Sequence, residues 1–314
     1  MKPRRRYHAP VIYYFEAVYR LGSIREAARS LHIASSAVSR QIQNLESDLG
    51  VQLFERLPKG LILTAAGESF AQHVRIVLQD TERVFSELEA LQGLQRGHIE
   101  IISVEGPTVD LLPELIQRFK LRYPNVSVGI SVSGSKSIPN EIIEGRADIG
   151  LVFDLQRNKE LQQVQVGNFK FGAVVAPDHP LSEKNALSYE DCLPFPLILS
   201  KSQLSIHQQL LTLKERVSTK SSIIESSSVQ LSRKFALKGM GIAFQTRIGI
   251  EEDILEGRLK HIPINNPSTI FSELGLYVRA HRSLPVAVDF LVREISHAIE
   301  QLTLEDSAAN LASG

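Results

Sequence analysis

Residues 22–43 constrain this chain more than any other segment, because they predict two short amphipathic helices joined by a tight turn. Ser23 is a candidate N-cap for the first helix. Two adjacent alanines, Ala27 and Ala28, would let a neighbouring helix approach closely. The three residues at 32–34 are too few for anything but a turn. This segment therefore predicts a compact pair of helices.

The second helix has a polar outer face beside an apolar face formed by Val38, Ile42 and Leu45. Serine, arginine and glutamine side chains suit the hydrogen-bonding edges of bases in the major groove. The pair is interpreted as a helix-turn-helix spanning Ile24 to Gln43, with the second helix as the recognition helix. An ordinary helical hairpin with a hydrated polar face is the alternative. The candidate base-reading residues are Ser35, Ser36, Ser39, Arg40 and Gln43.

A hairpin-like stretch follows the second helix. Gly50 is a candidate C-cap for that helix, and residues 55–64 carry Arg56 and Lys59 near the expected tip of the hairpin. Basic side chains at this place suit contacts with phosphates, which position a protein on DNA without reading its sequence. The stretch is therefore predicted to be a wing beside the helix-turn-helix.

The charge of the chain is unevenly distributed. Through Gly67 there are ten Lys or Arg residues and five acidic residues, a net charge of +5, whereas the whole chain has a net charge of +0. A basic head on an acidic body indicates that one end binds a polyanion. The basic run Arg4-Arg5-Arg6 is either a disordered terminus or an arm that contacts phosphates.

A long helix is predicted after Thr64, because no proline interrupts the chain until Pro107. Apolar side chains recur within it at alternating spacings of four and three, which is typical of a coiled coil. A helix packed on its own domain is the alternative, but that would require a broader apolar stripe. The heptad positions are Phe70, Val74, Val77, Thr81, Val84, Leu88 and Leu91, of which Val74, Val77, Val84, Leu88 and Leu91 are the predicted dimerisation residues.

From residue 99 on, short apolar runs alternate with amphipathic stretches, which predicts α/β architecture with largely parallel sheets. The expected strands are 99–104, 126–132, 147–153, 171–176, 197–199, 241–244 and 274–279. The expected helices are 110–123, 139–145, 205–216, 228–238, 248–256 and 285–302.

The run from Phe15 to Gly67 resembles the DNA-binding domain of the LysR-type transcriptional regulators. One departure is Ala34, where the family usually has a capping serine; either Ser35 caps instead or the helix begins less firmly, an effect of about 1 kcal/mol. The matching pieces are Ser23 with Ala27-Ala28, Ala37-Val38-Ser39-Arg40-Gln41-Ile42, Leu45-Glu46, Leu49-Gly50, Leu53-Phe54-Glu55-Arg56 and Leu63-Thr64-Ala65-Ala66-Gly67.

The resemblance continues through the body of the chain, which in this family is similar to periplasmic solute-binding proteins with an effector cleft between two lobes. Its matching pieces are Leu112-Pro113, Phe119, Arg122-Tyr123-Pro124, Val126, Gly145-Arg146-Ala147-Asp148-Ile149-Gly150-Leu151-Val152, His179-Pro180-Leu181 and Gly239-Met240-Gly241-Ile242-Ala243. The expected organisation is a multidomain α and α/β fold: a winged helix-turn-helix at 10–67, a linker helix at 68–96, an effector-binding domain at 97–303 (lobe I at 98–168 and 272–303, lobe II at 169–271) and a flexible tail at 304–314.

Loops at strand ends and helix N-termini favour anionic ligands in such folds. Three loops fit this description, at residues 134–137, 200–202 and 245–247. Helix capping is the alternative role for the serines in these loops. A fourth loop carries Glu105, whose charge favours an effector that also has an amine or hydroxyl groups. The candidate effector-binding residues are Ser135, Ser137, Ser202, Thr246, Lys201, Arg247 and Glu105.

Enzyme motifs and metal-binding clusters are not found in the sequence, so neither a catalytic site nor a metal or cofactor is expected. The single cysteine, Cys192, is interpreted as a small buried residue rather than a redox sensor. No apolar run reaches the roughly 18 residues of a membrane span. The arginine-rich start lacks the apolar core of a signal peptide, so a cytoplasmic location without membrane contact is expected.

These features together predict a sequence-specific DNA-binding transcriptional regulator whose activating or repressing action is controlled by a small-molecule effector. A cytoplasmic solute-binding or small-molecule enzyme domain without a DNA role is the alternative, and it explains only the body of the chain. The expected partners are a double-stranded DNA operator, further copies of the chain in a homodimer or homotetramer, the effector, and RNA polymerase.

Overall fold

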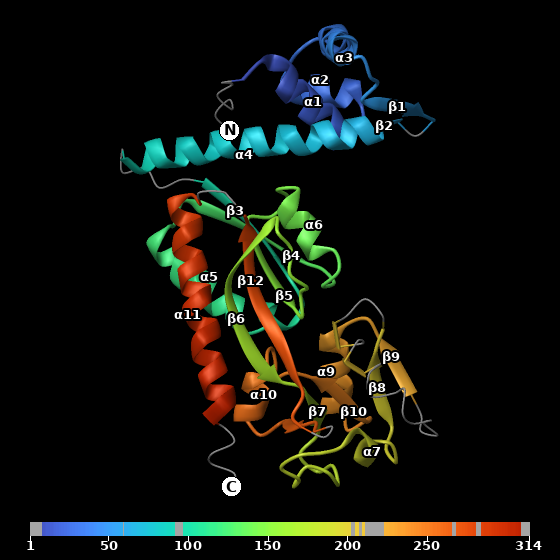
Figure 1. Ribbon diagram of the computed structural model, residues 1–314, viewed down its shortest axis with the longest axis vertical. Helices are drawn as coiled ribbons and strands as arrows, with labels where there is room; N and C mark the ends of the chain where they lie inside the picture. Colours follow the sequence, from blue (N-terminus) through green and yellow to red (C-terminus); the bar gives the residue numbers. More distant parts are fainter. Residues whose placement is uncertain are drawn as a thin grey trace. The chain divides into compact units, whose positions relative to one another are not determined.

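The computed structural model describes residues 8–58, 60–91, 97–201, 205–206, 209–210, 223–265, 268–280 and 284–308 (Figure 1). The chain divides into two compact units, Met1–Leu88 and Glu89–Gly314, and each is described by itself.

The first unit is built from helices that enclose one small core, with a two-stranded hairpin at its side. Phe15 and Val18 of the first helix are fully buried in this core, together with Ala27 and Val38 of the next two. The start of the hairpin adds Leu53. The elements are α1 (Pro10–Leu21), α2 (Ile24–Leu31), α3 (Ser35–Leu49), β1 (Phe54–Leu57), β2 (Gly60–Leu63) and the long α4 (Ala65–Leu91).

The second unit begins with a five-stranded sheet in the order β4-β3-β5-β12-β6. One face of this sheet packs against α5 and α11, which lie together in Figure 1, and the other face packs against α6. The elements of this lobe are β3 (Gly97–Ser103), a short 3-10 turn η1 (Gly106–Thr108), α5 (Leu111–Arg122), β4 (Val126–Val132), α6 (Ile138–Ile143), β5 (Ile149–Phe153), β6 (Leu161–Lys170), β12 (Phe271–Arg279) and α11 (Val286–Ala308).

A second five-stranded sheet, in the order β11-β7-β10-β8-β9, forms the other lobe. The chain enters this lobe at Phe171 and leaves it at Ile270, and the backbone N–H of Phe171 donates to the carbonyl of Ile270 at 2.8 Å. The elements of this lobe are β7 (Gly172–Val175), α7 (Tyr189–Cys192), β8 (Leu197–Ser200), β9 (Ile223–Ser226), α9 (Val229–Leu237), β10 (Ile242–Gln245), α10 (Glu251–Leu255) and β11 (Lys260–Pro263).

Three details differ from the sequence predictions. The sheets are mixed rather than largely parallel, because β12 and β7 each run antiparallel to both of their neighbours. Strands β6, β9 and β11 were not expected, since β6 carries four glutamine or asparagine residues and the other two have only four residues each. The tail expected from residue 304 is helical as far as Ala308, and Asp306 is buried there.

Among the described residues, no helix is long and apolar enough to cross a membrane. The helix expected at 205–216 falls mostly outside the described residues.

Candidate nucleic-acid interface and ligand site

The first helix of the predicted helix-turn-helix is fixed at both ends. The Ser23 hydroxyl accepts a hydrogen bond from the backbone N–H of Glu26 at 3.4 Å, as expected for an N-cap. His32 ends the helix in the left-handed conformation, with φ at 56°. Ala27 and Ala28 are fully buried, and α2 contacts both α1 and α3. The small side chains therefore allow the close helix packing that the sequence predicted.

The recognition helix α3 begins without a side-chain cap. Ala34 occupies the N-cap position and supplies no side-chain hydrogen bond, and Ser35 is already the first helical residue, so it does not replace the missing cap. Val38 and Ile42 are buried beneath the helix. Of the predicted base-reading residues, Ser35, Ser36, Arg40 and Gln43 are exposed, and Ser39 is half-buried.

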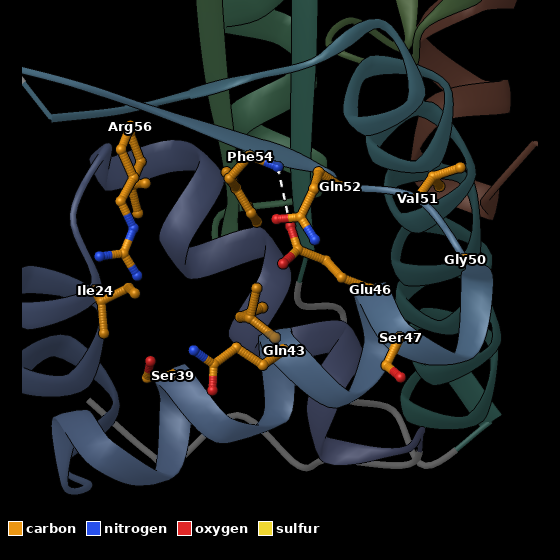
Figure 2. A pocket seen from close by; sticks show the side chains of 12 residues that line it. Ile24, Ser39, Gln43, Glu46, Ser47, Gly50, Val51, Gln52, Phe54 and Arg56 are labelled. Carbon is orange, nitrogen blue, oxygen red and sulfur yellow. Dashed lines mark hydrogen bonds between the residues drawn. The ribbon is translucent and has the colours of Figure 1, made fainter.

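A crevice of about 530 Å³ separates α3 from the wing. Ser39 and Gln43 line it from the helix, and Arg56 lines it from β1. Figure 2 shows Arg56 extending from the wing toward Ile24 and Gln43 on the helices. Three of the residues predicted to contact DNA therefore lie around one crevice. Arg40 and Arg56 are both exposed to solvent.

The wing is an antiparallel hairpin, with Phe54 opposite Leu63 and Leu57 opposite Gly60. Its second strand is attached to the end of α1, because the backbone N–H of Leu61 donates to the carbonyl of Gly22 at 2.8 Å. Lys59, the other residue predicted to contact phosphates, lies outside the described residues.

Helix α4 continues from the wing, and its first turns belong to the core of the DNA-binding head. Thr64 caps the helix by accepting from the N–H of Gly67 at 3.0 Å. Val74, a predicted dimerisation residue, is 1% exposed and packs in this core, so it has no surface left for a second copy. Val84 and Leu88 are 40% and 49% exposed. Val77 is half-buried, and the side chain of Leu91 lies outside what the structure describes.

In the second unit, the predicted ligand residues lie on both lobes. The Ser135 hydroxyl is buried and has no hydrogen-bond partner in the described structure. Ser137 is exposed, and its hydroxyl donates to the carbonyl of Gly134 at 3.0 Å and lies 2.7 Å from the hydroxyl of Ser133. Ser137 therefore makes no capping bond to α6. The alternative role of Ser137 as a side-chain cap is therefore not seen, and effector binding by Ser135 and Ser137 stays a prediction.

Thr246 is buried directly after β10, and its neighbour Arg247 is half-buried. The Arg247 guanidinium pairs with the carboxylate of Glu251 at 2.8 Å. Burial raises the pKa of Glu251, although Arg247 opposes this shift. Lys201 is exposed, and Ser202 lies outside the described residues.

Glu105 joins the two lobes. Its carboxylate accepts a hydrogen bond from the hydroxyl of Ser228 at 2.7 Å and another from the backbone N–H of Val229 at 2.6 Å. Ser228 is the N-cap of α9, so a carboxylate from one lobe occupies the N-terminus of a helix in the other. Ser228 was predicted only as the start of a helix, since no local pattern links it to a residue 123 positions earlier.

A second contact between the lobes lies close by. A Cβ atom on Gly249 would come within 2.6 Å of the carbonyl oxygen of Gly106, and Gly249 has a φ of +85°. Only glycine fits this position without strain. The neighbouring Ile248 packs into the core of the first lobe, so the two lobes are in direct apolar contact here.

Buried and half-buried ionisable groups lie near the point where the chain passes between the lobes. Burial, together with the nearby charges of Arg247 and Lys170, lowers the pKa of His261 to about 4. The carboxylate of Asp306 accepts from the backbone N–H of Lys170 at 2.9 Å. No local sequence pattern distinguishes His261, Lys170 or Asp306, because their partners are distant in the chain. Elsewhere, burial raises the pKa of the Cys192 thiol to about 12, in agreement with a small buried residue.

Comparison with known proteins agrees with this division into a head and a body. Residues 11–68 match the family described as "Bacterial regulatory helix-turn-helix protein, lysR family". Residues 92–299 match the family described as "LysR substrate binding domain". Among curated proteins, a "Probable RuBisCO transcriptional regulator" from Gracilaria tenuistipitata var. liui is 28% identical over 287 residues, covering 89% of this chain and 93% of the relative.

Solved structures have the same fold. A full-length OxyR variant from Pseudomonas aeruginosa gives a TM-score of 0.73 at 19% identity, covering 93% of this chain and 95% of the other. Full-length CbnR, described as a LysR family regulator and crystallised with its target DNA, gives 0.61 at 18% identity, covering 92% and 99%. The described residues contain no group of three or more metal-binding side chains. With its helix-turn-helix head and effector-binding body, this chain belongs to the LysR family of DNA-binding transcriptional regulators, which are not enzymes.

Proposed function

We propose that α3 reads bases in the major groove while the wing holds the adjacent backbone. The observation that carries this proposal is the exposed polar face of α3 beside the crevice that Arg56 also lines. Side chains of these types match base edges and phosphates, respectively. The proposed base-reading residues are Ser35, Ser36, Ser39, Arg40 and Gln43, and the proposed backbone contacts are Arg56 and Lys59.

Selection of DNA sites from a random library by the full-length protein tests this assignment. The wild type should enrich a short repeated motif, because a dimer presents two recognition helices. Arg40→Ala should change or abolish the motif, whereas Arg118→Ala, on the exposed surface of α5, should not. The assignment is wrong if Arg40→Ala enriches the wild-type motif unchanged.

Dimerisation through α4 is the second part of the proposal. Val84 and Leu88 are large apolar side chains one turn apart, and both remain substantially exposed in a single chain. Burying them against a second copy would remove this apolar surface from water. The dimer would place two heads on one operator, and a homotetramer would follow from further contacts between bodies.

A small, polar, anionic metabolite bound between the lobes is the proposed effector. The buried Ser135 hydroxyl without a partner supports a polar ligand on one lobe, and Thr246 is its proposed counterpart on the other. Lys201 is the remaining candidate for the balancing charge, since Arg247 is paired with Glu251. Binding would change how the lobes meet, and the dimer would pass this change to the heads and to RNA polymerase. A regulator of this kind would work in the cytoplasm.

A further inference from the structure

The carboxylate of Glu46 ties the recognition helix to the wing. Glu46 lies on α3 and is only 7% exposed. Its Oε1 atom accepts hydrogen bonds from the backbone N–H groups of Leu53, at 2.8 Å, and Phe54, at 3.1 Å. Figure 2 shows Glu46 directed at the start of the wing strand. One side-chain oxygen on the recognition helix thus fixes the point at which the chain enters β1.

The surroundings of this contact explain why a polar side chain is needed there. Leu53 and Phe54 are buried, and the Phe54 ring packs against Phe15 with centroids 5.1 Å apart. Backbone N–H groups in such a place must be paired, because an unpaired one is costly. Glu46 on α3 supplies an acceptor for both of these N–H groups.

Glu46 also lines the crevice between the recognition helix and the wing. Arg56 follows Phe54 by two residues on β1. The hydrogen bonds of Glu46 therefore hold the backbone that carries Arg56 at a fixed place beside α3. We propose that Glu46 is a positioning residue for DNA binding, which holds the wing so that Arg56 and the polar face of α3 engage DNA together. This inference rests on the proposed roles of Arg56 and Arg40.

A double-mutant cycle on the full-length protein tests it, with affinity for a selected DNA site measured by fluorescence anisotropy and scaled to the active fraction. Glu46→Ala should weaken binding by about tenfold. In that background Arg56→Ala should cost less than about twofold, because the wing is already misplaced. Arg40→Ala should keep its full effect, since α3 itself is unchanged. A residue that only stabilises the fold would leave both effects intact.

Two conservative variants distinguish the length of the Glu46 side chain from its charge. Glu46→Gln keeps an acceptor oxygen at the same reach and should bind like the wild type. Glu46→Asp keeps the charge but is one methylene shorter, so it should behave like Glu46→Ala. If Glu46→Ala does not fold, Glu46→Asp replaces it in the double-mutant cycle. Asp48→Ala, an exposed carboxylate on the same helix, is the matched control and should not weaken binding.

The outcomes are distinguishable. The proposal is overturned if Arg56→Ala costs the same factor with and without Glu46, or if Asp replaces Glu46 fully while Gln does not. If Arg56→Ala has no effect in the wild type, the proposed wing contact is wrong, and the positioning role falls with it.

Discussion

Glu105 and Ser228 lie on different lobes of the effector-binding domain, and their side chains are joined by a hydrogen bond of 2.7 Å. The same Ser228 hydroxyl accepts from the backbone N–H of Leu231 at 3.1 Å, so it caps α9 while it donates to Glu105. The carboxylate also pairs the N–H of Val229, one of the helical N–H groups that lack a partner within the helix. A contact that holds one lobe to the other is thus built from a single acidic side chain.

Removing this carboxylate should destabilise the domain. Glu105→Ala loses two hydrogen bonds to a charged acceptor, so we expect the free energy of unfolding to fall by about 2 kcal/mol. Glu105→Gln, which keeps one acceptor, should lose less. Urea denaturation of the full-length protein measures both. Glu114→Ala, an exposed residue on α5, is the control. Equal midpoints for Glu105→Ala and the wild type would show that the lobes do not depend on this bond.

Base contacts and backbone contacts should respond differently to mutation. Arg40→Ala should cost about 1–3 kcal/mol on the specific site and relax the sequence preference there. Lys59→Ala should weaken binding to all sequences alike and reduce the slope of log affinity against log salt by about 1. Titrations on specific and random DNA at several salt concentrations separate the two. A wild-type preference in Arg40→Ala would rule out a base-reading role for this residue.

The exposed half of α4 should carry the dimer. Leu88→Glu places a charge in the proposed seam, where burial without a partner costs several kcal/mol. We expect sedimentation analysis to show a dimer weakened by at least about tenfold, with loss of operator binding. Val286→Glu, at an exposed apolar position on α11, should change neither. A Leu88→Glu protein that sediments as the wild type does would place the interface elsewhere.

His261 should make stability depend on pH. Its pKa falls from 6.5 to about 4 on folding, so the unfolded chain binds the proton more tightly than the folded one does. The stability that neutral His261 allows is therefore fully present above pH 6.5. As the pH falls toward 4, the free energy of unfolding should decrease by about 1–3 kcal/mol. His261→Asn should flatten this part of the curve of unfolding free energy against pH, and His297→Asn, on an exposed face of α11, should not. The same acid sensitivity in His261→Asn would contradict this role.

Ser135 should contribute to effector binding. A panel of small organic acids and amino acids, screened by thermal shift on the full-length protein, should include a compound that raises the melting temperature. Ser135→Ala should reduce that rise strongly, whereas Ser137→Ala should have a smaller effect, because its hydroxyl already has partners. A rise that survives in the double variant would move the ligand away from this loop.

Local periodicity allowed much of this fold to be predicted from the sequence. The helix-turn-helix follows from the spacing of Val38 and Ile42 and from the short turn at His32, and the structure has both. The first strand of the body was expected because Ile99, Ile101, Ile102 and Val104 make this short segment mostly apolar, and it is β3. Each of these signals lies within about fifteen residues, where side-chain pattern and backbone geometry are directly linked.

Contacts between distant residues were beyond the reach of such patterns. Glu105 was predicted as an effector-binding residue, and its hydrogen bonds with Ser228 and Val229 in the other lobe were not foreseen. Val74 fitted the heptad spacing, but its place in the head's own core depends on how α4 docks against α1. Arg247 was expected to balance a ligand's charge, although an acidic residue four positions later neutralises it. For Glu105 and Val74 the tertiary fold provides contacts that the local sequence does not specify, whereas the pair of Arg247 with Glu251 is local, at the i,i+4 spacing of a helix.

The burial of Val74 sets a limit on how the parts of this regulator can be exchanged. A chimera that fused another regulator's body at residue 67, where the resemblance to the DNA-binding domain ends, would discard Ala71 and Val74 from the head's core. A junction beyond residue 78 would keep these turns of α4 with the head that they stabilise. The portable DNA-reading module of this protein is therefore longer than its winged helix-turn-helix, and biosensor designs that borrow it should include the first half of the linker helix.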